Sequence, residues 1–386
     1  MSKKFLPYGR QSIDQADIDA VVEVLRGDWL TTGPAVSGFE EDFAAHFGAR
    51  YAVACSNATA GLHLALVGLD VGPGDVCVVP SITFLASANA ALYCGADVVF
   101  ADVDPATGLM TPETLAAALA RAGKVKAVLP VHLAGQCEDL EALSQLCYDQ
   151  GASMVEDACH AVGTRWREQA VGGCAHSMAS VFSFHPVKTL ASGEGGMVTT
   201  HDDRLAERMR SLRSHGMERS PDRLLSPDEG PWWYEMQALG WNYRLTDMQA
   251  ALARSQLSRL PLFKARRQAL SARYDALLEG DPVIRPNART PECDPCLHLY
   301  SVQIDFAARG QSRGDVMDAL HARGIGTQVH YIPVHSQPYY RYRYGDQVLP
   351  GAAAYYAQTL TLPLFPGMED RDPERVISVL REVLGV

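Results

Sequence analysis

The sequence predicts an α/β protein in which a mostly parallel sheet is followed by a smaller α+β domain. From residue 50 to about 200, short β-rich runs alternate with helical stretches, the pattern of a sheet with crossover helices. The 386 residues, 47% of them hydrophobic and 20% charged, are enough to bury a large core in two domains. A long helical stretch separates the sheet region from a second, shorter mixture of strands and helices.

Seven segments are predicted to be strands of the large sheet. They are Tyr51–Cys55, Val76–Pro80, Asp97–Asp102, Lys126–Val131, Ser153–Glu156, Ser180–Phe184 and Gly196–Thr200. Amphipathic helices are expected over Thr111–Arg121 and Glu138–Tyr148 between them. Because a parallel connection usually needs a dozen or more residues, the short gap before Gly196–Thr200 predicts that this strand is antiparallel to its neighbours.

A helical stretch from Thr246 to about Leu278 is expected to bridge the domains, with a bend at Pro261. Two strands and two helices are predicted beyond it: His298–Ile304, Gly326–His330, Ser312–Arg323 and Pro373–Val383. We therefore expect a large domain over residues 1–255, which includes an N-terminal arm, and a small C-terminal domain over residues 256–386.

The charge of the chain disfavours two classes of partner. The formal net charge is −11, so neither nucleic acid nor an anionic membrane is expected to attract the protein.

The amino terminus turns polar before any long apolar stretch develops, so no secretory signal is expected and a cytoplasmic location is predicted. The uncharged run from Val76 to Ala96 contains Pro80 and Asn89 and is interpreted as buried strand, loop and helix. The nine cysteines are spread along the chain and are expected to be reduced.

Three chemical groups are expected at the carboxyl edge of the sheet, where ligands of open α/β sheets bind. The segment Ser56–Thr59 follows the first strand and opens a helix, whose free N–H groups suit a phosphate. The alternative is that Asn57 and Thr59 are plain helix caps. Asp157 closes the fifth strand, where a buried carboxylate needs a cationic partner. That partner is either a protonated pyridine nitrogen or a structural arginine.

Lys188, the third group, lies in the largely uncharged stretch SVFSFHPVKTLASGEGGMVTT. Desolvation lowers the pKa of an amine, and the neutral amine is the form that adds to an aldehyde to make a Schiff base. The alternative is a lysine whose head reaches solvent along its stem. Ser183 and its backbone are candidate phosphate donors, and Gly193, Gly195 and Gly196 permit the sharp return of the chain.

The order SNAT, EDACHA, FSFHPVK, GEGGM, RSHGM and GWNYRLTD resembles the DegT/DnrJ/EryC1/StrS sugar aminotransferases, which are fold-type I pyridoxal-phosphate enzymes. The similarity covers nearly the whole chain, from LTTGPAVSGFEEDFA to VHYIPVH. It implies that pyridoxal 5'-phosphate is the cofactor, that Lys188 carries it as an internal aldimine, and that Asp157 pairs with the pyridine nitrogen. Some related dehydratases replace this lysine with histidine, so the presence of Lys188 favours transamination.

The resemblance also implies the remaining cofactor contacts. They fall on Phe84 for stacking on the ring, on Ala58, Thr59 and Ser183 for the phosphate, and on His160, where many relatives have Gln. Asn242 of GWNYRLTD is supplied to the cofactor by the other subunit, which implies a homodimer with shared active sites.

Within the family, SNAT, His160 and FSFHPVK are most similar to the transaminases of pseudaminic-acid synthesis. The implied reaction moves an amino group from glutamate to C4 of a UDP-linked 4-keto-6-deoxy-N-acetylhexosamine, with His330 and Tyr331 in the sugar-nucleotide pocket. Amination at C3 and other acceptors, a UDP-pentose or a GDP- or dTDP-linked 4-keto-6-deoxyhexose, stay open. A non-catalytic regulatory protein is the alternative of a different class, which the acidic charge and the presence of Lys188 and Asp157 disfavour.

One further motif has the local spacing of a metal site. Cys293, Cys296 and His298 lie within six residues, but a closed zinc site needs four ligands and no second cluster is evident. We expect no metal, and the role of the two cysteines stays open.

Overall fold

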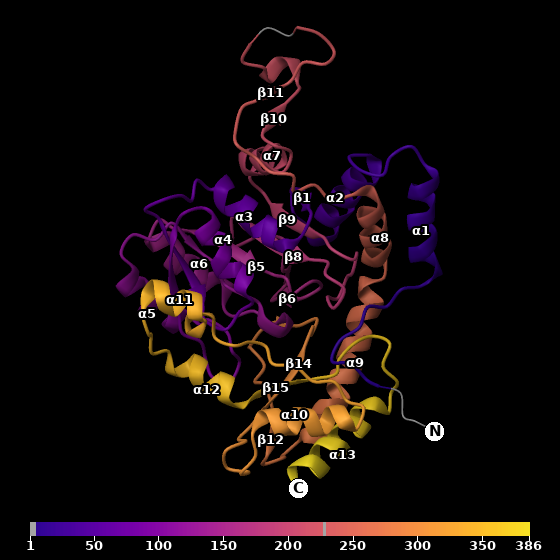
Figure 1. The fold of residues 1–386 in the computed structure, drawn as a ribbon, viewed down its shortest axis with the longest axis vertical. Coiled ribbons are helices and arrows are strands. Elements are labelled where there is room, and N and C mark those ends of the chain that lie inside the picture. Colours follow the sequence, from indigo (N-terminus) through magenta and orange to yellow (C-terminus); the bar gives the residue numbers. More distant parts are fainter. Residues whose placement is uncertain (1–4, 227–228) are drawn as a thin grey trace.

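The computed structural model describes residues 5–226 and 229–386, and a seven-stranded sheet lies at its centre (Figure 1). Its strands are β1 (Tyr51–Cys55), β2 (Val76–Pro80), β3 (Asp97–Ala101), β4 (Ala127–Val128), β5 (Ser153–Asp157), β8 (Ala179–Ser183) and β9 (Gly196–Thr200). They are ordered β1-β9-β8-β5-β4-β2-β3, and β9 is antiparallel to both of its neighbours while the other pairs are parallel. The predicted sheet and the predicted direction of its last strand are confirmed.

Helices cover both faces of this sheet, because the buried strands are apolar on both sides. Along β1, Val53 and Cys55 pack into one apolar cluster and Ala52 and Ala54 into another, as the alternation of side chains requires. Helices α3 (Ala58–Gly68), α4 (Leu85–Tyr93) and α7 (Asp203–Leu212) contribute to the first cluster. On the other face lie α2 (Pro34–Phe47), α5 (Pro112–Ala122) and α6 (Leu140–Asp149).

The long helical stretch is two helices, α8 (Asp247–Ser258) and α9 (Leu260–Leu278), which meet at Arg259. The predicted bend is therefore present, two residues before Pro261, because proline fits the first turn of a new helix better than the interior of an old one. In Figure 1 the two helices run from the large sheet down to a second, three-stranded sheet.

This second sheet has the order β12-β14-β15, with β12 (Ile284–Pro286), β14 (Tyr300–Ile304) and β15 (Thr359–Leu362). Helices α10 (Arg313–Ala322) and α13 (Asp372–Leu384) pack together beside it, close to their predicted bounds. A separate apolar cluster joins these elements to α9 and to Leu6 of the N-terminal segment. Helices α11 (Pro338–Tyr344) and α12 (Pro350–Gln358) instead contribute Tyr340, Ala352 and Tyr355 to a cluster of the large sheet.

The strand predicted over Gly326–His330 is wrong. Its backbone pairs at single positions with two different neighbours, because Gly326 N–H donates to Leu6 and Gln328 exchanges hydrogen bonds with Thr361. Since neither neighbour continues alongside it, no ladder forms.

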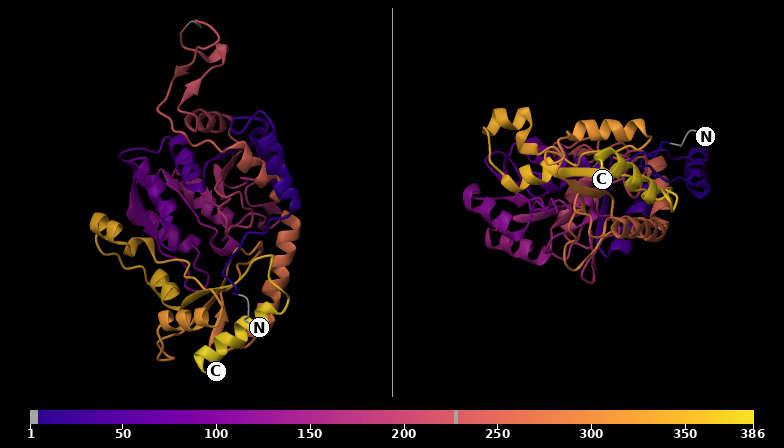
Figure 2. Two further views of the ribbon diagram at one scale, coloured as in Figure 1. Left: turned by 45° about the vertical axis from the view of Figure 1, so that its right-hand side comes forward. Right: turned by 90° about the horizontal axis from the view of Figure 1, so that it is seen from below.

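The remaining elements are short or peripheral. They are α1 (Gln15–Arg26), β6 (Arg165–Trp166), β7 (Gln169–Ala170), β10 (Met217–Glu218), β11 (Glu235–Met236), β13 (Cys293–Asp294) and the 3-10 turns η1 (Leu133–Gly135), η2 (Pro221–Arg223) and η3 (Val334–Ser336). The pair β10–β11 extends away from the body of the molecule in both side views (Figures 1 and 2). Across the described ranges, no helix is both long and apolar enough to cross a membrane.

Candidate active site

The site is assembled at one edge of the large sheet. Strands β1, β5 and β8 run in the same direction, so Cys55, Asp157 and Ser183 all end at this edge. Gly196 on β9 lies opposite both Cys55 and Ser183, and Asp157 lies opposite Val181. The sheet therefore brings together the groups that the sequence predicted at its carboxyl edge.

The first turn of α3 forms an anion site beside this edge. Asn57 is the helix cap, because its side chain accepts the N–H of Ala60 at 2.9 Å. The N–H groups of Ala58 and Thr59 lie in the same turn, where the helix itself offers no acceptor. A Cβ at Gly196 would lie 2.6 Å from the carbonyl carbon of Asn57, so only glycine lets this turn approach β9 so closely. The interpretation of Asn57 as a helix cap is confirmed. The contacts of Ala58, Thr59 and Ser183 with a phosphate stay predictions.

Lys188 lies in the turn after β8, where its N–H donates to the carbonyl oxygen of His185 at 2.8 Å. The side chain retains partial access to solvent, yet burial of the amine lowers its pKa below the ordinary value of lysine. The negative charge of Asp157 acts in the opposite direction. Burial raises the pKa of the Cys159 thiol well above its ordinary value, so this thiol is protonated and Asp157 is the negative charge near Lys188. Burial therefore favours the neutral form of the Lys188 amine, which is the form that attacks a carbonyl.

Asp157 is held by a hydroxyl group from α4 and by a backbone N–H. Its Oδ2 accepts a hydrogen bond from Ser87 Oγ at 2.7 Å, and Ser87 Oγ lies 2.7 Å from Thr83 Oγ1. Its Oδ1 accepts the N–H of Cys159 at 3.2 Å. The carboxylate is 5% exposed and no arginine or lysine is paired with it among the described ion pairs, so a cationic ligand would complete its surroundings. The sequence reasoning missed Ser87 and Thr83; two hydroxyls four residues apart around Phe84 were the available signal.

His160 and Tyr331 form a directed hydrogen-bond chain. Nδ1 of His160 accepts the N–H of Ala134 at 3.3 Å, and since an amide only donates, the ring proton is on Nε2. Burial lowers the pKa of His160 well below its ordinary value, so the ring is neutral. Nε2 then donates to the Tyr331 hydroxyl at 3.1 Å, which leaves the tyrosine proton for another acceptor. The Tyr331 ring lies 6.0 Å from that of Phe84, whose side chain is 59% exposed and has an open face for stacking.

Two further buried histidines lie behind this chain. The rings of His298 and His160 are 4.5 Å apart, and Nδ1 of His298 is a buried atom without a partner. Nδ1 of His330 lies 2.9 Å from Thr361 Oγ1, and burial lowers the pKa of His330 to about 3. His330 is thus neutral at pH 7 and can take part in hydrogen bonds but carries no positive charge. His298, and Tyr8 with its ring 5.5 Å from His330, were also missed from the sequence.

Asn242 lies outside this cluster. It is exposed and forms an isolated antiparallel bridge with Ser214. The carbonyl oxygen of the next residue, Tyr243, accepts the N–H of Ser56 at 2.8 Å, so Asn242 stands at the surface close to the start of α3. Its contact with the cofactor of a second subunit stays a prediction.

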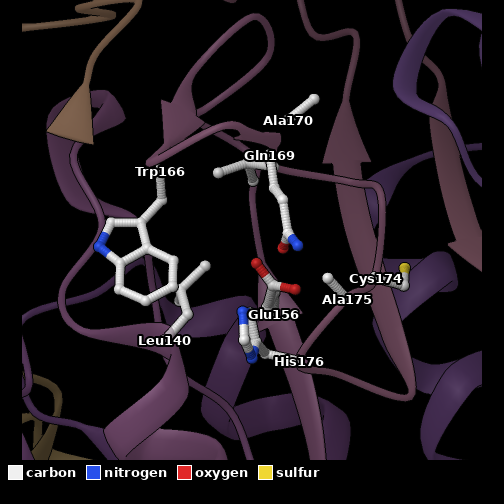
Figure 3. A pocket seen from close by; sticks show the side chains of 9 residues that line it. Leu140, Glu156, Trp166, Gln169, Ala170, Cys174, Ala175 and His176 are labelled. Carbon is white, nitrogen blue, oxygen red and sulfur yellow. The ribbon is translucent and has the colours of Figure 1, made fainter. Parts of the chain in front are cut away.

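The small cavity in Figure 3 lies on the opposite side of β5 and is not a substrate pocket. Its volume of about 10 Å³ is enough for one water molecule. Glu156 points into it, is 2.7 Å from His132 Nε2, and accepts a hydrogen bond from Ser180 at 2.9 Å. Burial acts to raise the pKa of Glu156, but the hydrogen bonds from His132, Ser177 and Ser180 outweigh it, so the net pKa lies below the ordinary value.

Within the described ranges, no group of three or more His, Cys, Asp and Glu side chains is arranged to hold a metal ion. Cys293 contacts Cys137 across 3.6 Å, whereas Cys296 packs near Gly163. His298 faces His160. The three residues of the metal-like motif therefore point to different neighbours.

Pyridoxal phosphate fits the residues that are present. The orphaned Nδ1 of His298 and the carboxylate of Asp157, which has no described ion-pair partner, mark an incomplete polar site, and the first turn of α3 has N–H groups that suit an anion. A ring between Phe84 and the sheet edge would bring its nitrogen to Asp157 and its aldehyde to Lys188. The contacts of Phe84, Asp157 and Lys188 with the cofactor stay predictions.

Comparisons with known proteins agree over nearly the whole chain. The model of the DegT/DnrJ/EryC1/StrS aminotransferase family matches residues 11–381. The spore coat polysaccharide biosynthesis protein SpsC of Bacillus subtilis (strain 168) is 39% identical over 383 residues, which are 98% of this chain and 97% of SpsC.

Solved structures show the same arrangement of elements. PseC of Helicobacter pylori, described as an aminotransferase involved in the biosynthesis of pseudoaminic acid, has a TM-score of 0.91 at 28% identity and covers 99% of this chain and 100% of its own. Spr1654 of Streptococcus pneumoniae, in its PLP-form, has a TM-score of 0.90 at 28% identity and covers 99% of both chains.

Proposed function

Because the chain belongs to the DegT/DnrJ/EryC1/StrS aminotransferase family, we propose that it transfers an amino group from glutamate to C4 of a UDP-linked 4-keto-6-deoxy-N-acetylhexosamine. The chain is a sugar aminotransferase with the fold-type I architecture, and pyridoxal 5'-phosphate is its cofactor. The observation that carries the proposal is the partly buried Lys188, with its lowered pKa, beside the unpaired carboxylate of Asp157.

Pyridoxal phosphate, when bound, supplies an aldehyde that accepts the amino group and a pyridine ring that withdraws electrons. Lys188 would hold it through Nζ and would move a proton at the donor carbon and at C4 of the sugar. The lowered pKa of Lys188 suits both tasks, because it increases the share of the neutral amine that can accept a proton.

Asp157 keeps a proton on the pyridine nitrogen, since its negative charge stabilises the protonated form. Ser87 donates to the oxygen of Asp157 that Cys159 does not use, and so orients the carboxylate. On the other side of the site, Tyr331 receives its hydrogen bond from His160 and presents its own proton to the ligands.

Substrate choice is supported by relatives. The PseC structure is described as acting in pseudoaminic acid biosynthesis, and SpsC is described as acting in spore coat polysaccharide biosynthesis.

Incubation with glutamate and a panel of keto sugar nucleotides tests the proposal. We expect 2-oxoglutarate and a new primary amine on C4 of the UDP-linked N-acetylhexosamine. Conversion of only a UDP-pentose or of a GDP- or dTDP-linked sugar would overturn the substrate and leave the aminotransferase activity in place.

We propose a homodimer in which Asn242 of each subunit reaches the partner's phosphate. Large apolar side chains at the surface support an interface: Trp29 is 58% exposed, Trp232 is 68% exposed and Leu239 is 77% exposed. The projecting β10–β11 hairpin lies in the same stretch of chain as Trp232 and Leu239.

Two further proposals concern organisation and location. A division into residues 1–255 and 256–386 is supported by the separate apolar cluster around α9, α10 and α13. A cytoplasmic location is supported by the nine free thiols, because thiols persist in reducing compartments.

A further inference from the structure

Two cysteines from distant parts of the sequence meet near the active site. Cys137 follows the turn η1 and Cys293 lies on β13, and their Sγ atoms are 3.6 Å apart. A disulfide bond is about 2.05 Å long, so the two sulfur atoms need to approach by roughly 1.5 Å. Rotation of the side chains is the first movement available for this.

The two thiols differ in access to solvent. Cys137 is fully buried, whereas Cys293 is partly exposed. A hydrogen bond between them lowers the pKa of Cys293 to about 7 and raises that of Cys137. Since the thiolate is the attacking form, Cys293 is the thiol that meets an oxidant and Cys137 is the one that resolves the first product.

The two segments that carry Cys137 and Cys293 are already joined by hydrogen bonds. Gln136 donates to the carbonyl oxygen of Ala288 at 3.1 Å and accepts the N–H of Thr290 at 3.2 Å. His298 N–H donates to the carbonyl oxygen of Ala134 at 2.9 Å. These contacts hold the two segments side by side, so the two sulfur atoms stay within 3.6 Å of each other.

The same two segments carry parts of the active site. Ala134 fixes the tautomer of His160 through its N–H, and the ring of His298 packs against that of His160 at 4.5 Å. A covalent link between Cys137 and Cys293 would therefore fasten the residues before β14 to the turn that supports His160.

We propose that Cys137 and Cys293 form a reversible disulfide that clamps residues 293–298 to the turn η1. The Cys293 thiolate attacks a sulfur atom of a low-molecular-weight disulfide and displaces one thiolate, which takes up a proton. Cys137 then attacks Cys293 Sγ, loses its proton and displaces the second thiol. The two cysteines lose two hydrogen atoms in total and the oxidant is reduced to two thiols, so the exchange balances.

The clamp stabilises the folded protein without touching Lys188 or Asp157. A cross-link between residues so far apart in sequence removes conformational freedom from the unfolded chain. We expect the melting temperature to rise by about 5 °C, while the rate of amino transfer stays within about twofold.

The test uses the full-length protein treated with glutathione disulfide, alkylated and digested with trypsin. We expect a linked pair of peptides, one containing Cys137 and the other Cys293, and a higher melting temperature that dithiothreitol reverses. Each of these peptides contains other cysteines as well, so fragment-ion masses must assign the bond.

The Cys293→Ser variant should lose both the linked peptides and the rise in melting temperature. Cys94→Ser is the matched control, because Cys94 is also partly exposed and bonds a carbonyl that serine can reach. Nine alkylated thiols after oxidation, a bond between other cysteines, or the same rise in Cys293→Ser would overturn the proposal. Peptide mapping of the wild-type protein decides the question even if a variant does not fold.

Discussion

The replacement of Ser87 by alanine tests how Asp157 is prepared for the cofactor. The hydroxyl donates to Asp157 Oδ2 at 2.7 Å, and Ser87 is fully buried. A hydrogen bond to a charged group contributes about 1.5 to 3 kcal/mol, which corresponds to roughly 10- to 100-fold in a dissociation constant. Because Cys159 N–H still binds Oδ1, we expect Ser87→Ala to weaken cofactor binding by about tenfold.

The measurement is a titration of the apoprotein with pyridoxal phosphate, followed by the visible absorbance of the bound cofactor. Ser180→Ala is the matched control, because Ser180 is equally buried and donates to Glu156, the preceding carboxylate of β5, at 2.9 Å. Both variants should lose stability in urea, but only Ser87→Ala should bind the cofactor more weakly. Equal cofactor affinities in the two variants would refute the role of Ser87.

Four other outcomes are expected. Lys188→Ala should lose the borohydride-reducible link to the cofactor, and Lys188→Arg should not restore it because a guanidinium stays protonated; a wild-type amount of adduct would contradict this. Asp157→Asn should slow the half-reaction with glutamate by roughly 10- to 1000-fold, since a neighbouring carboxylate changes a proton equilibrium by that factor; near-normal single-turnover rates would contradict this. Inactive Lys188→Ala and Asn242→Ala subunits, once mixed, should regain about a quarter of the activity, because one site of each hybrid dimer is intact; proven exchange without activity would count against shared sites. The pKa of His330 is about 3 in the folded protein, below its value in the unfolded chain, so the free energy of unfolding should fall as the pH drops below about 6.5. The loss should reach about 2 kcal/mol at pH 5. Urea unfolding of the His330→Gln variant at pH 7 and pH 5 should show a smaller loss than the wild-type protein.

The large sheet was predictable because each of its strands is a short apolar run between turns. Val76–Pro80 and Gly196–Thr200 have the predicted bounds, and the short connection before the latter correctly indicated its direction. The segment Gly326–His330 has similar local composition but no continuous neighbour, so the error there concerns tertiary contacts rather than local preference.

In the candidate site, too, some residues could be predicted from the sequence and others could not. Asp157 was recognisable as a carboxylate at the end of a buried strand, and Lys188 as a lysine in a largely uncharged stretch of chain. Ser87 was not, because a serine in a helix is common and its role depends on β5 lying beside α4, a contact between residues 70 apart. His298 was interpreted within a metal-like motif, whereas its ring contacts His160, which no local spacing reveals.

Strand β5 places two consecutive carboxylates on opposite sides of the sheet, and only Glu156 has a basic side chain as a described hydrogen-bond partner. Glu156 lies 2.7 Å from His132, whereas Asp157 has hydroxyl and amide donors alone. Asp157 thus keeps room in its surroundings for the cationic group of a ligand, which would stabilise the folded protein on binding. By thermodynamic linkage, the free energy of unfolding should increase with the logarithm of the pyridoxal phosphate concentration once that concentration exceeds the dissociation constant.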